Sequence, residues 1–182
     1  QLILRKGNAF HTLSLEAGSA LSEAIHCVPP GPVLCARLCP NGQLLAIQRS
    51  ATSVIIVNTM DPKVNAWEVP FRKQQRNFVL TNGVVWCEAP LDPTQDTLPY
   101  PQVTLALVTA NGLELHRIMH ERRSSRLYKV IERQCSRFWV LPSRRFLLLG
   151  TDRDSGSSVQ LRGVFLNQQD AAQDAHASPH TQ

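Results

Sequence analysis

The sequence predicts an all-β protein, specifically a partial WD-repeat-like β-propeller of about three to four blades. Short runs rich in Val, Ile, Leu and aromatic residues recur along the chain, and Gly, Pro, Asn and Asp separate them. A pair of apolar runs joined through a proline also repeats, at spacings of roughly 40–50 residues, which is typical of propeller blades. Apolar runs bounded by turn residues are typical of strands, so these observations agree on the fold class.

The composition is that of an ordinary folded domain. The chain has 182 residues, of which 43% are hydrophobic and 18% charged, and its formal net charge is +5. No apolar run approaches the about 18 residues that a membrane-spanning helix needs. The sequence therefore argues against a transmembrane, collagen-like or wholly disordered chain, and its first residues show no secretory hydrophobic segment.

The order of the strands follows from the apolar runs and their turns. Asn41-Gly42 and Asn111-Gly112 each lie between two runs and predict tight hairpins with positive φ at both central residues. The stretches 17–24 and 115–126 could be read as helices, but we assign a loop to the first and, because polar and apolar residues alternate there, a strand to the start of the second. The predicted strands are 1–5, 9–16, 23–27, 33–38, 44–49, 53–58, 65–69, 83–88, 103–109, 113–119, 126–131, 137–141, 146–151 and 159–165.

The repeat divides the chain into blades. Residues 1–27 are predicted to supply the later strands of one blade, 33–70 and 77–133 the next two, and 137–165 the start of a fourth. We expect part of a larger ring, or a product with exposed sheet edges. The predicted domains are an incomplete N-terminal β-propeller over 1–166 and a disordered polar tail over 167–182, with a solvated surface loop at 91–101.

The cysteines are predicted to be buried thiols. Their number is odd and no C-x-x-C pair occurs, which fits a reducing, cytosolic compartment better than a disulfide framework or a zinc site. They are Cys27, Cys35, Cys39, Cys87 and Cys135.

No motif for catalysis is found. The sequence lacks a nucleophile elbow, a P-loop and a metalloprotease helix. We interpret His116 and His120 as solvent-facing strand histidines, and His176 and His180 as tail residues. The sequence therefore predicts a protein that is not an enzyme, with no catalytic, cofactor-binding or metal site.

A basic cluster is the one feature that suggests a partner on physical grounds. Nine Arg or Lys residues lie between Arg117 and Arg145, with Glu121 and Glu132 as the acids among them. Three interpretations stay open: a solvated face, a contact for an acidic or phosphorylated protein or an anionic lipid surface, and a nucleic-acid site. Aromatic residues are too sparse for a stacking platform, so nucleic acid is not expected. The candidate partner-binding residues are Arg122, Arg123, Arg126, Lys129, Arg144 and Arg145.

Four blocks of sequence carry a resemblance to a known family. They are ARLCPNGQLLAIQRS at 36–50 with Ser53-Val54, Trp86-Cys87, TANGLEL at 109–115, and RFWVLP at 137–142. In this order and spacing they resemble the N-terminal propeller of the Mic-one-like family, the regulator subunit (called Bulli in flies) of the Mon–Ccz guanine-nucleotide exchange factor. The resemblance covers about residues 1–166.

The resemblance implies a non-catalytic scaffold. It implies binding to the Mon and Ccz subunits, support for a late-endosomal Rab GTPase, and roles in endosome–lysosome traffic and autophagy. It further implies a cytoplasmic protein, peripheral on late endosomes and lysosomes, with possible membrane association. No sharp family motif transfers a binding residue, so the basic cluster is a candidate from its charge alone.

Overall fold

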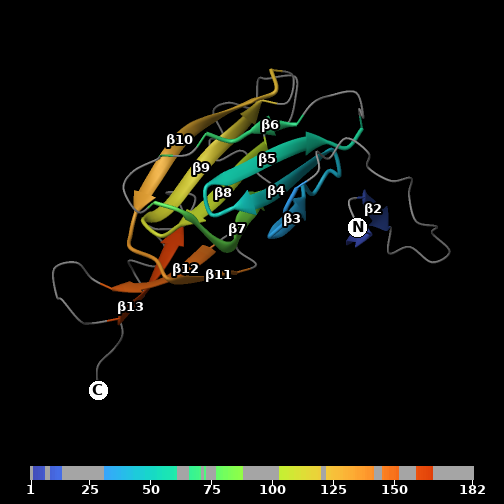
Figure 1. Cartoon of the computed structure of the whole chain (residues 1–182). Helices are drawn as coiled ribbons and strands as arrows, with labels where there is room; N and C mark the ends of the chain where they lie inside the picture. Colours follow the sequence, from blue (N-terminus) through green and yellow to red (C-terminus); the bar gives the residue numbers. More distant parts are fainter. Residues whose placement is uncertain are drawn as a thin grey trace.

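The computed structural model is all-β, as the sequence predicts (Figure 1). It describes residues 2–6, 9–13, 31–60, 66–70, 72, 77–87, 103–119, 122–141, 145–151 and 159–165. Within these residues every regular element is a strand. The strands are β1 (Leu2–Lys6), β2 (Ala9–Leu13), β3 (Cys35–Leu38), β4 (Leu44–Ser50), β5 (Ser53–Asn58), β6 (Trp67–Glu68), β7 (Val79–Cys87), β8 (Val103–Thr109), β9 (Gly112–Met119), β10 (Ser124–Glu132), β11 (Arg137–Val140), β12 (Arg145–Thr151) and β13 (Val159–Phe165).

The strands form four antiparallel sheets in which each strand pairs with its neighbour in sequence. Sheet 1 contains β1 and β2, sheet 2 contains β3 to β6, sheet 3 contains β7 to β10, and sheet 4 contains β11 to β13. Sheets 2, 3 and 4 coincide with the units predicted at 33–70, 77–133 and 137–165. A four-stranded antiparallel sheet of this kind is the form of a propeller blade, so the predicted division into blades agrees with the sheets.

Three apolar cores join the sheets in series. Phe10 of β2 packs with Leu45 and Ile47 of sheet 2, a second core lies between sheets 2 and 3, and a third lies between sheets 3 and 4. Figure 1 shows sheets 1 and 4 at opposite ends of this stack. Each inner sheet is therefore covered on both faces.

Burial on both faces explains why the middle strands contain continuous apolar runs, such as Leu105–Val108 of β8. In β8, Leu105 and Leu107 enter the core shared with sheet 2, whereas Ala106 and Val108 enter the core shared with sheet 4. Successive side chains of a strand point to opposite faces, so the part of a strand that lies between two cores is mostly apolar at consecutive positions.

Two expected turns form, but with a different geometry. The hairpins at Asn41-Gly42 and Asn111-Gly112 are present. Positive φ is confined to the glycines, with 77° at Gly42 and 133° at Gly112, and neither asparagine has it. The expectation of positive φ at both central residues is therefore wrong. A glycine that follows the turn supplies the conformation instead, as in hairpins with a glycine bulge.

Strand β7 begins earlier than predicted because it contains an irregularity. The prediction started at 83, whereas the strand starts at Val79 and its register with β8 shifts between Val79 and Val84. Asn82 has a φ of 60°. Asparagine tolerates this left-handed conformation, so Asn82-Gly83 lies within a bulged strand.

Several sequence predictions lie outside the described residues. They include the strand at 23–27, the loop at 91–101 and the tail at 167–182, together with the domain boundary at 166. Strand β6 is shorter than the predicted 65–69, and β10 is longer than the predicted 126–131.

Candidate functional site

The basic cluster is concentrated on the hairpin of β9 and β10, at the outer edge of sheet 3. Strand β10 is the last strand of that sheet and pairs with β9 alone among the described strands. We define the basic hairpin by the five cations on these two strands and their turn. They are Arg117, Arg122, Arg123, Arg126 and Lys129.

The strand register places two of these cations directly opposite each other. Arg117 of β9 pairs with Arg126 of β10, so their side chains leave the same face of the sheet. Arg126 is exposed and Arg117 is partly buried. Like charges at directly opposed positions destabilise a strand pair, so this pairing is unfavourable for folding taken alone.

A β-bulge brings an aromatic ring to the same face. The register of β10 shifts between Leu127 and Lys129, which leaves Tyr128 as the extra residue. The guanidinium carbon of Arg117 lies 5.3 Å from the centroid of the Tyr128 ring, within the range of a cation–π contact. Tyr128 is 37% exposed. The bulge thus fixes Arg117 and Tyr128 together on an accessible face.

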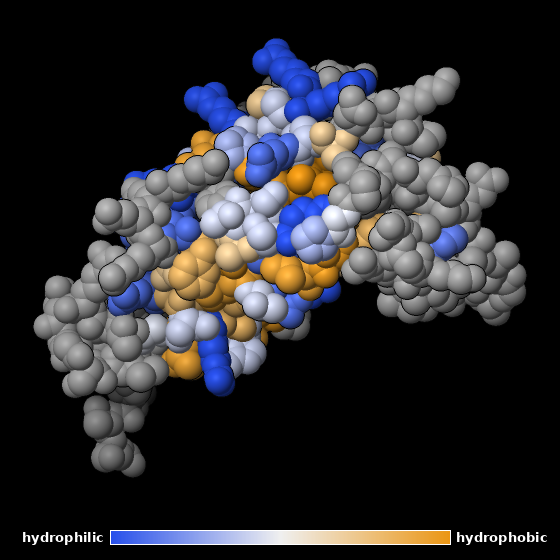
Figure 2. Space-filling view, in the orientation of Figure 1, coloured by the Kyte–Doolittle hydropathy of each residue, from blue (hydrophilic) through white to orange (hydrophobic). Residues whose placement is uncertain are grey.

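The turn of the hairpin carries two more arginines. Arg122 and Arg123 are both exposed, and Arg123 has a φ of 46°. Glycine or asparagine adopts this left-handed conformation with least strain. The space-filling view shows strongly hydrophilic side chains projecting at this end of β9 and β10 (Figure 2).

The described carboxylates do not neutralise the basic hairpin. Those carboxylates are Glu68, Glu114 and Glu132. Within the described residues, Glu132 forms an ion pair with Arg72 and Glu114 contacts His116, so neither carboxylate contacts a cation of the basic hairpin. The described carboxylates therefore leave the charge of the basic hairpin unpaired.

The remaining candidates from the sequence are not placed in this group. Arg144 lies outside the described residues, and Arg145 opens β12, where its backbone pairs with Phe165. Strand β12 belongs to sheet 4 rather than sheet 3. The structure therefore gathers Arg122, Arg123, Arg126 and Lys129 on one hairpin and gives no such placement for the other two.

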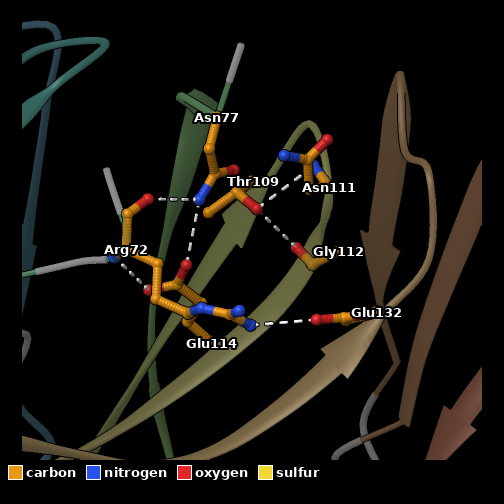
Figure 3. A network of polar contacts seen from close by, with 7 residues as sticks. All are labelled: Arg72, Asn77, Thr109, Asn111, Gly112, Glu114 and Glu132. Atoms are coloured by element: carbon orange, nitrogen blue, oxygen red, sulfur yellow. Dashed lines mark hydrogen bonds and ion pairs between the residues drawn. The ribbon is translucent and has the colours of Figure 1, made fainter. Parts of the chain in front are cut away.

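A second polar group lies on the opposite face of β9, around the buried carboxylate of Glu114 (Figure 3). Its Oε1 accepts a hydrogen bond from Asn77 Nδ2 at 3.0 Å, and its Oε2 accepts one from the backbone N–H of Arg72 at 3.2 Å. Asn77 Nδ2 also donates to the Arg72 carbonyl at 2.8 Å. The Arg72 guanidinium reaches Glu132 of β10 at 3.0 Å. These contacts attach the segment that follows sheet 2 to the outer strands of sheet 3.

His116 belongs to this buried group, so its interpretation as a solvent-facing histidine is wrong. Its side chain is 0% exposed, and its Nε2 lies 3.4 Å from Glu114 Oε2. Residues two apart in a strand share a face, and this face of β9 packs toward sheet 2. Burial of both faces of a strand cannot be read from one strand alone, which is why the sequence did not show it. The alternation of Glu114 and His116 with Leu113 and Leu115 was the available signal.

Four of the cysteines are buried and form no disulfide among the described residues, as predicted: Cys35, Cys39, Cys87 and Cys135. Burial raises the pKa of Cys35 and of Cys135 above the usual 9.0, because desolvation penalises the thiolate. The thiols of Cys35 and Cys135 are therefore protonated near neutral pH and are poor nucleophiles there. Cys27 lies outside the described residues.

The described residues show no group of three His, Cys, Asp or Glu side chains placed to hold a metal ion. They also contain no helix that is long and apolar enough to cross a membrane.

Successive antiparallel sheets stacked through apolar faces, with a charged hairpin at one edge, define an all-β protein of stacked sheets. The family model described as "Regulator of MON1-CCZ1 complex, N-terminal" matches residues 2–125, and the chain belongs to this family. The match covers sheets 1 and 2 and sheet 3 as far as the start of β10. A comparison with curated proteins finds no match. The resemblance seen in the sequence is thereby confirmed.

Proposed function

We propose that this chain is a non-catalytic subunit that binds the MON1–CCZ1 complex through its blades and regulates it. The observation that carries the proposal is the family match over residues 2–125. In this proposal the complex acts as an exchange factor for a late-endosomal Rab GTPase, and the chain supports endosome–lysosome traffic and autophagy. The chain would then work in the cytoplasm, at the surface of late endosomes and lysosomes.

The stacked sheets are suited to such a role. Each inner sheet has apolar residues on both faces, so the strands of sheets 2 and 3 pack against their neighbours in a fixed arrangement. Rigid elements position a binding surface more accurately than a free loop does. The buried carboxylate of Glu114 accepts hydrogen bonds from Arg72 and Asn77. These polar groups therefore have a structural role, because they join one segment of the described chain to another.

Co-purification tests this proposal directly. The tagged chain would be expressed in cells with the MON1 and CCZ1 proteins and isolated at moderate salt, with a full-length family member as the positive control. We expect MON1 and CCZ1 to be retained together with the chain. Loss of both, with the chain still soluble and the control still bound, would overturn the proposal for this chain.

The dependence on salt separates this function from the alternative, which is binding of an acidic or phosphorylated partner, an anionic lipid or RNA through the basic hairpin. Contacts to phosphate weaken steeply as the ionic strength rises, whereas an interface made by apolar blade surfaces responds much less. Retention of MON1 and CCZ1 at raised salt would favour an apolar interface. Release over the same range would point to the basic hairpin.

A further inference from the structure

We propose that the basic hairpin is a contact site for an anionic membrane surface, with its cations donating to the phosphate and carboxylate oxygens of phosphatidylserine headgroups. The proposal rests on charge, register and exposure in the described residues. It does not depend on binding to MON1 or CCZ1.

The basic hairpin carries an excess of positive charge in a short segment. Residues 117–129 contain five Arg or Lys residues and one acid, Glu121. None of the five cations forms an ion pair within the described part of the chain. An anionic surface attracts such a cluster.

The arrangement of cations on the basic hairpin is unfavourable without an anion. Arg117 and Arg126 are directly opposed, and like charges at such positions destabilise a hairpin. Arg123 occupies a left-handed position in the turn, with a φ of 46°, which glycine or asparagine would adopt with less strain. Strain at an exposed turn is typical of residues kept for function. Both features are explained if the side chains serve an anionic ligand.

The cations are spread along the hairpin. Arg126 and Lys129 lie roughly 10 Å apart in β10, at about 3.3 Å per residue, and the turn before this strand adds Arg122 and Arg123. The cations thus form a row along a sheet edge, longer than one phosphate group. A row of this length matches several headgroups of a membrane surface better than it matches a single bound phosphate.

The aromatic residue favours lipid over nucleic acid. The ring of Tyr128 is covered on one side by the Arg117 guanidinium, at 5.3 Å, so that face is not open to a stacked base. A half-exposed tyrosine suits the boundary between water and lipid, because the ring is apolar and the hydroxyl is polar. Met119, at the end of β9, is also partly exposed.

Vesicle sedimentation tests the proposal with the whole chain. The probes are vesicles of phosphatidylcholine alone and vesicles of phosphatidylcholine mixed with phosphatidylserine. The test variant is Arg122→Glu/Arg123→Glu/Arg126→Glu. The matched control is Arg37→Glu/Arg133→Glu/Arg137→Glu, which reverses three exposed arginines elsewhere and changes the net charge equally. Circular dichroism confirms that both variants fold.

We expect binding to the anionic vesicles only, and at least a tenfold loss of that binding in the hairpin variant, because each basic residue near an anionic surface raises binding about fivefold. The control variant should lose much less. Arg123→Asn adds a second test, since asparagine accepts the turn conformation while the charge is removed. This variant should fold at least as stably as the parent chain and bind the anionic vesicles about fivefold more weakly.

Four results would overturn the proposal. The first two are equal binding of the chain to both kinds of vesicle and binding to neither. The third is an equal loss of binding in the two triple variants. In the fourth, the hairpin variant keeps its binding to anionic vesicles but fails to co-purify with MON1 and CCZ1, which would make the hairpin a protein contact. Loss of vesicle binding with MON1 and CCZ1 retained would support the proposal and leave the proposed function intact.

Discussion

Gly112 follows the hairpin turn at a position that has no room for a side chain. It opens β9 with a φ of 133°, and a Cβ there would overlap the carbonyl oxygen of Ile131 and lie 2.7 Å from the backbone nitrogen of Arg133. We expect Gly112→Ala to lower the free energy of unfolding by about 2 kcal/mol or more, because backbone strain and overlap add. Urea denaturation measures the loss.

Gly42→Asn is the control for that variant. Gly42 has a φ of 77°, which asparagine tolerates, so we expect a loss of less than about 1 kcal/mol. Equal losses in the two variants would contradict the view that close backbone contacts make Gly112 the more sensitive position.

The carboxylate of Glu114 is expected to stabilise sheet 3. Its side chain is 3% exposed, and it accepts the N–H groups of Arg72 and Asn77. Glu114→Ala should cost about 1–3 kcal/mol, because removing the acceptor leaves donors buried without a partner. Thermal unfolding measures the effect, with about 2–4 °C expected for each kcal/mol in a chain of this size.

Glu132→Ala is the matched control, because it removes a carboxylate that also contacts Arg72. The Glu132 side chain is 73% exposed, and exposed ion pairs contribute about 0–1 kcal/mol. If Glu114→Ala and Glu132→Ala unfold at the same temperature, burial of the carboxylate does not determine how much it stabilises the chain.

We expect the folded chain to lose stability at alkaline pH because of the buried thiols of Cys35 and Cys135. Burial raises the pKa of both thiols above 9.0 in the folded chain, so the unfolded chain releases these protons first as the pH rises. Their contribution to stability is therefore complete below about pH 8.5 and is lost as the pH rises toward the folded pKa. Urea midpoints between pH 7 and pH 10 test this, and Cys35→Ala/Cys135→Ala should flatten the decline.

At the scale of strands and sheets, Gln48 is the side chain that ties sheet 2 to the irregular start of β7. It is 1% exposed, and its Nε2 donates to the carbonyls of Val79 and Leu80, each at 3.2 Å. Trp86 of β7 makes a comparable link, donating from Nε1 to the Arg37 carbonyl at 2.8 Å. These side chains join β3 and β4 of sheet 2 to β7 of sheet 3, in addition to the apolar contacts between the two sheets.

We expect Gln48→Leu to destabilise the chain by about 1–3 kcal/mol, because the side-chain hydrogen bonds to the two carbonyls are lost. Hydrogen exchange should show increased opening at the start of β7 before it affects β9. Gln43→Leu, at an exposed position of the same sheet, should change stability by less than about 0.5 kcal/mol. If hydrogen exchange at the start of β7 is unchanged in Gln48→Leu, Gln48 does not stabilise that part of the strand.

At the scale of the whole molecule, sheet 4 differs from sheets 2 and 3. It has three strands, and its register places Trp139, Leu147, Leu149 and Leu161 on the face away from the core shared with sheet 3. Trp139 is 46% exposed and Leu161 is 57% exposed. In sheets 2 and 3 the corresponding faces are covered by the neighbouring sheets. The apolar face of sheet 4 has no covering sheet among the described residues.

An uncovered apolar face of this kind predicts self-association of the isolated chain. Trp139→Lys/Leu161→Lys should lower the apparent mass in light scattering at high concentration, because charge on the face opposes contact between copies. Met60→Lys is the control, since Met60 is 73% exposed outside this face. If all three proteins scatter alike, the face does not drive association.

The sequence by itself determined the fold class, the order of the strands and the division into repeating units. These properties depend on alternation within a strand and on turn residues between strands, which act over a few neighbouring positions. The basic cluster was visible for the same reason, since Arg122, Arg123, Arg126 and Lys129 lie close together along the chain.

Only the tertiary structure decided which faces are covered and which side chains meet. It buried His116 beside Glu114, opposed Arg117 to Arg126, and used a bulge to bring Tyr128 to the same face. A strand register is set by pairing with another strand, and a bulge shifts every later side chain relative to it. Contacts between sheets depend on the packing of whole faces, so no short stretch of sequence contains them.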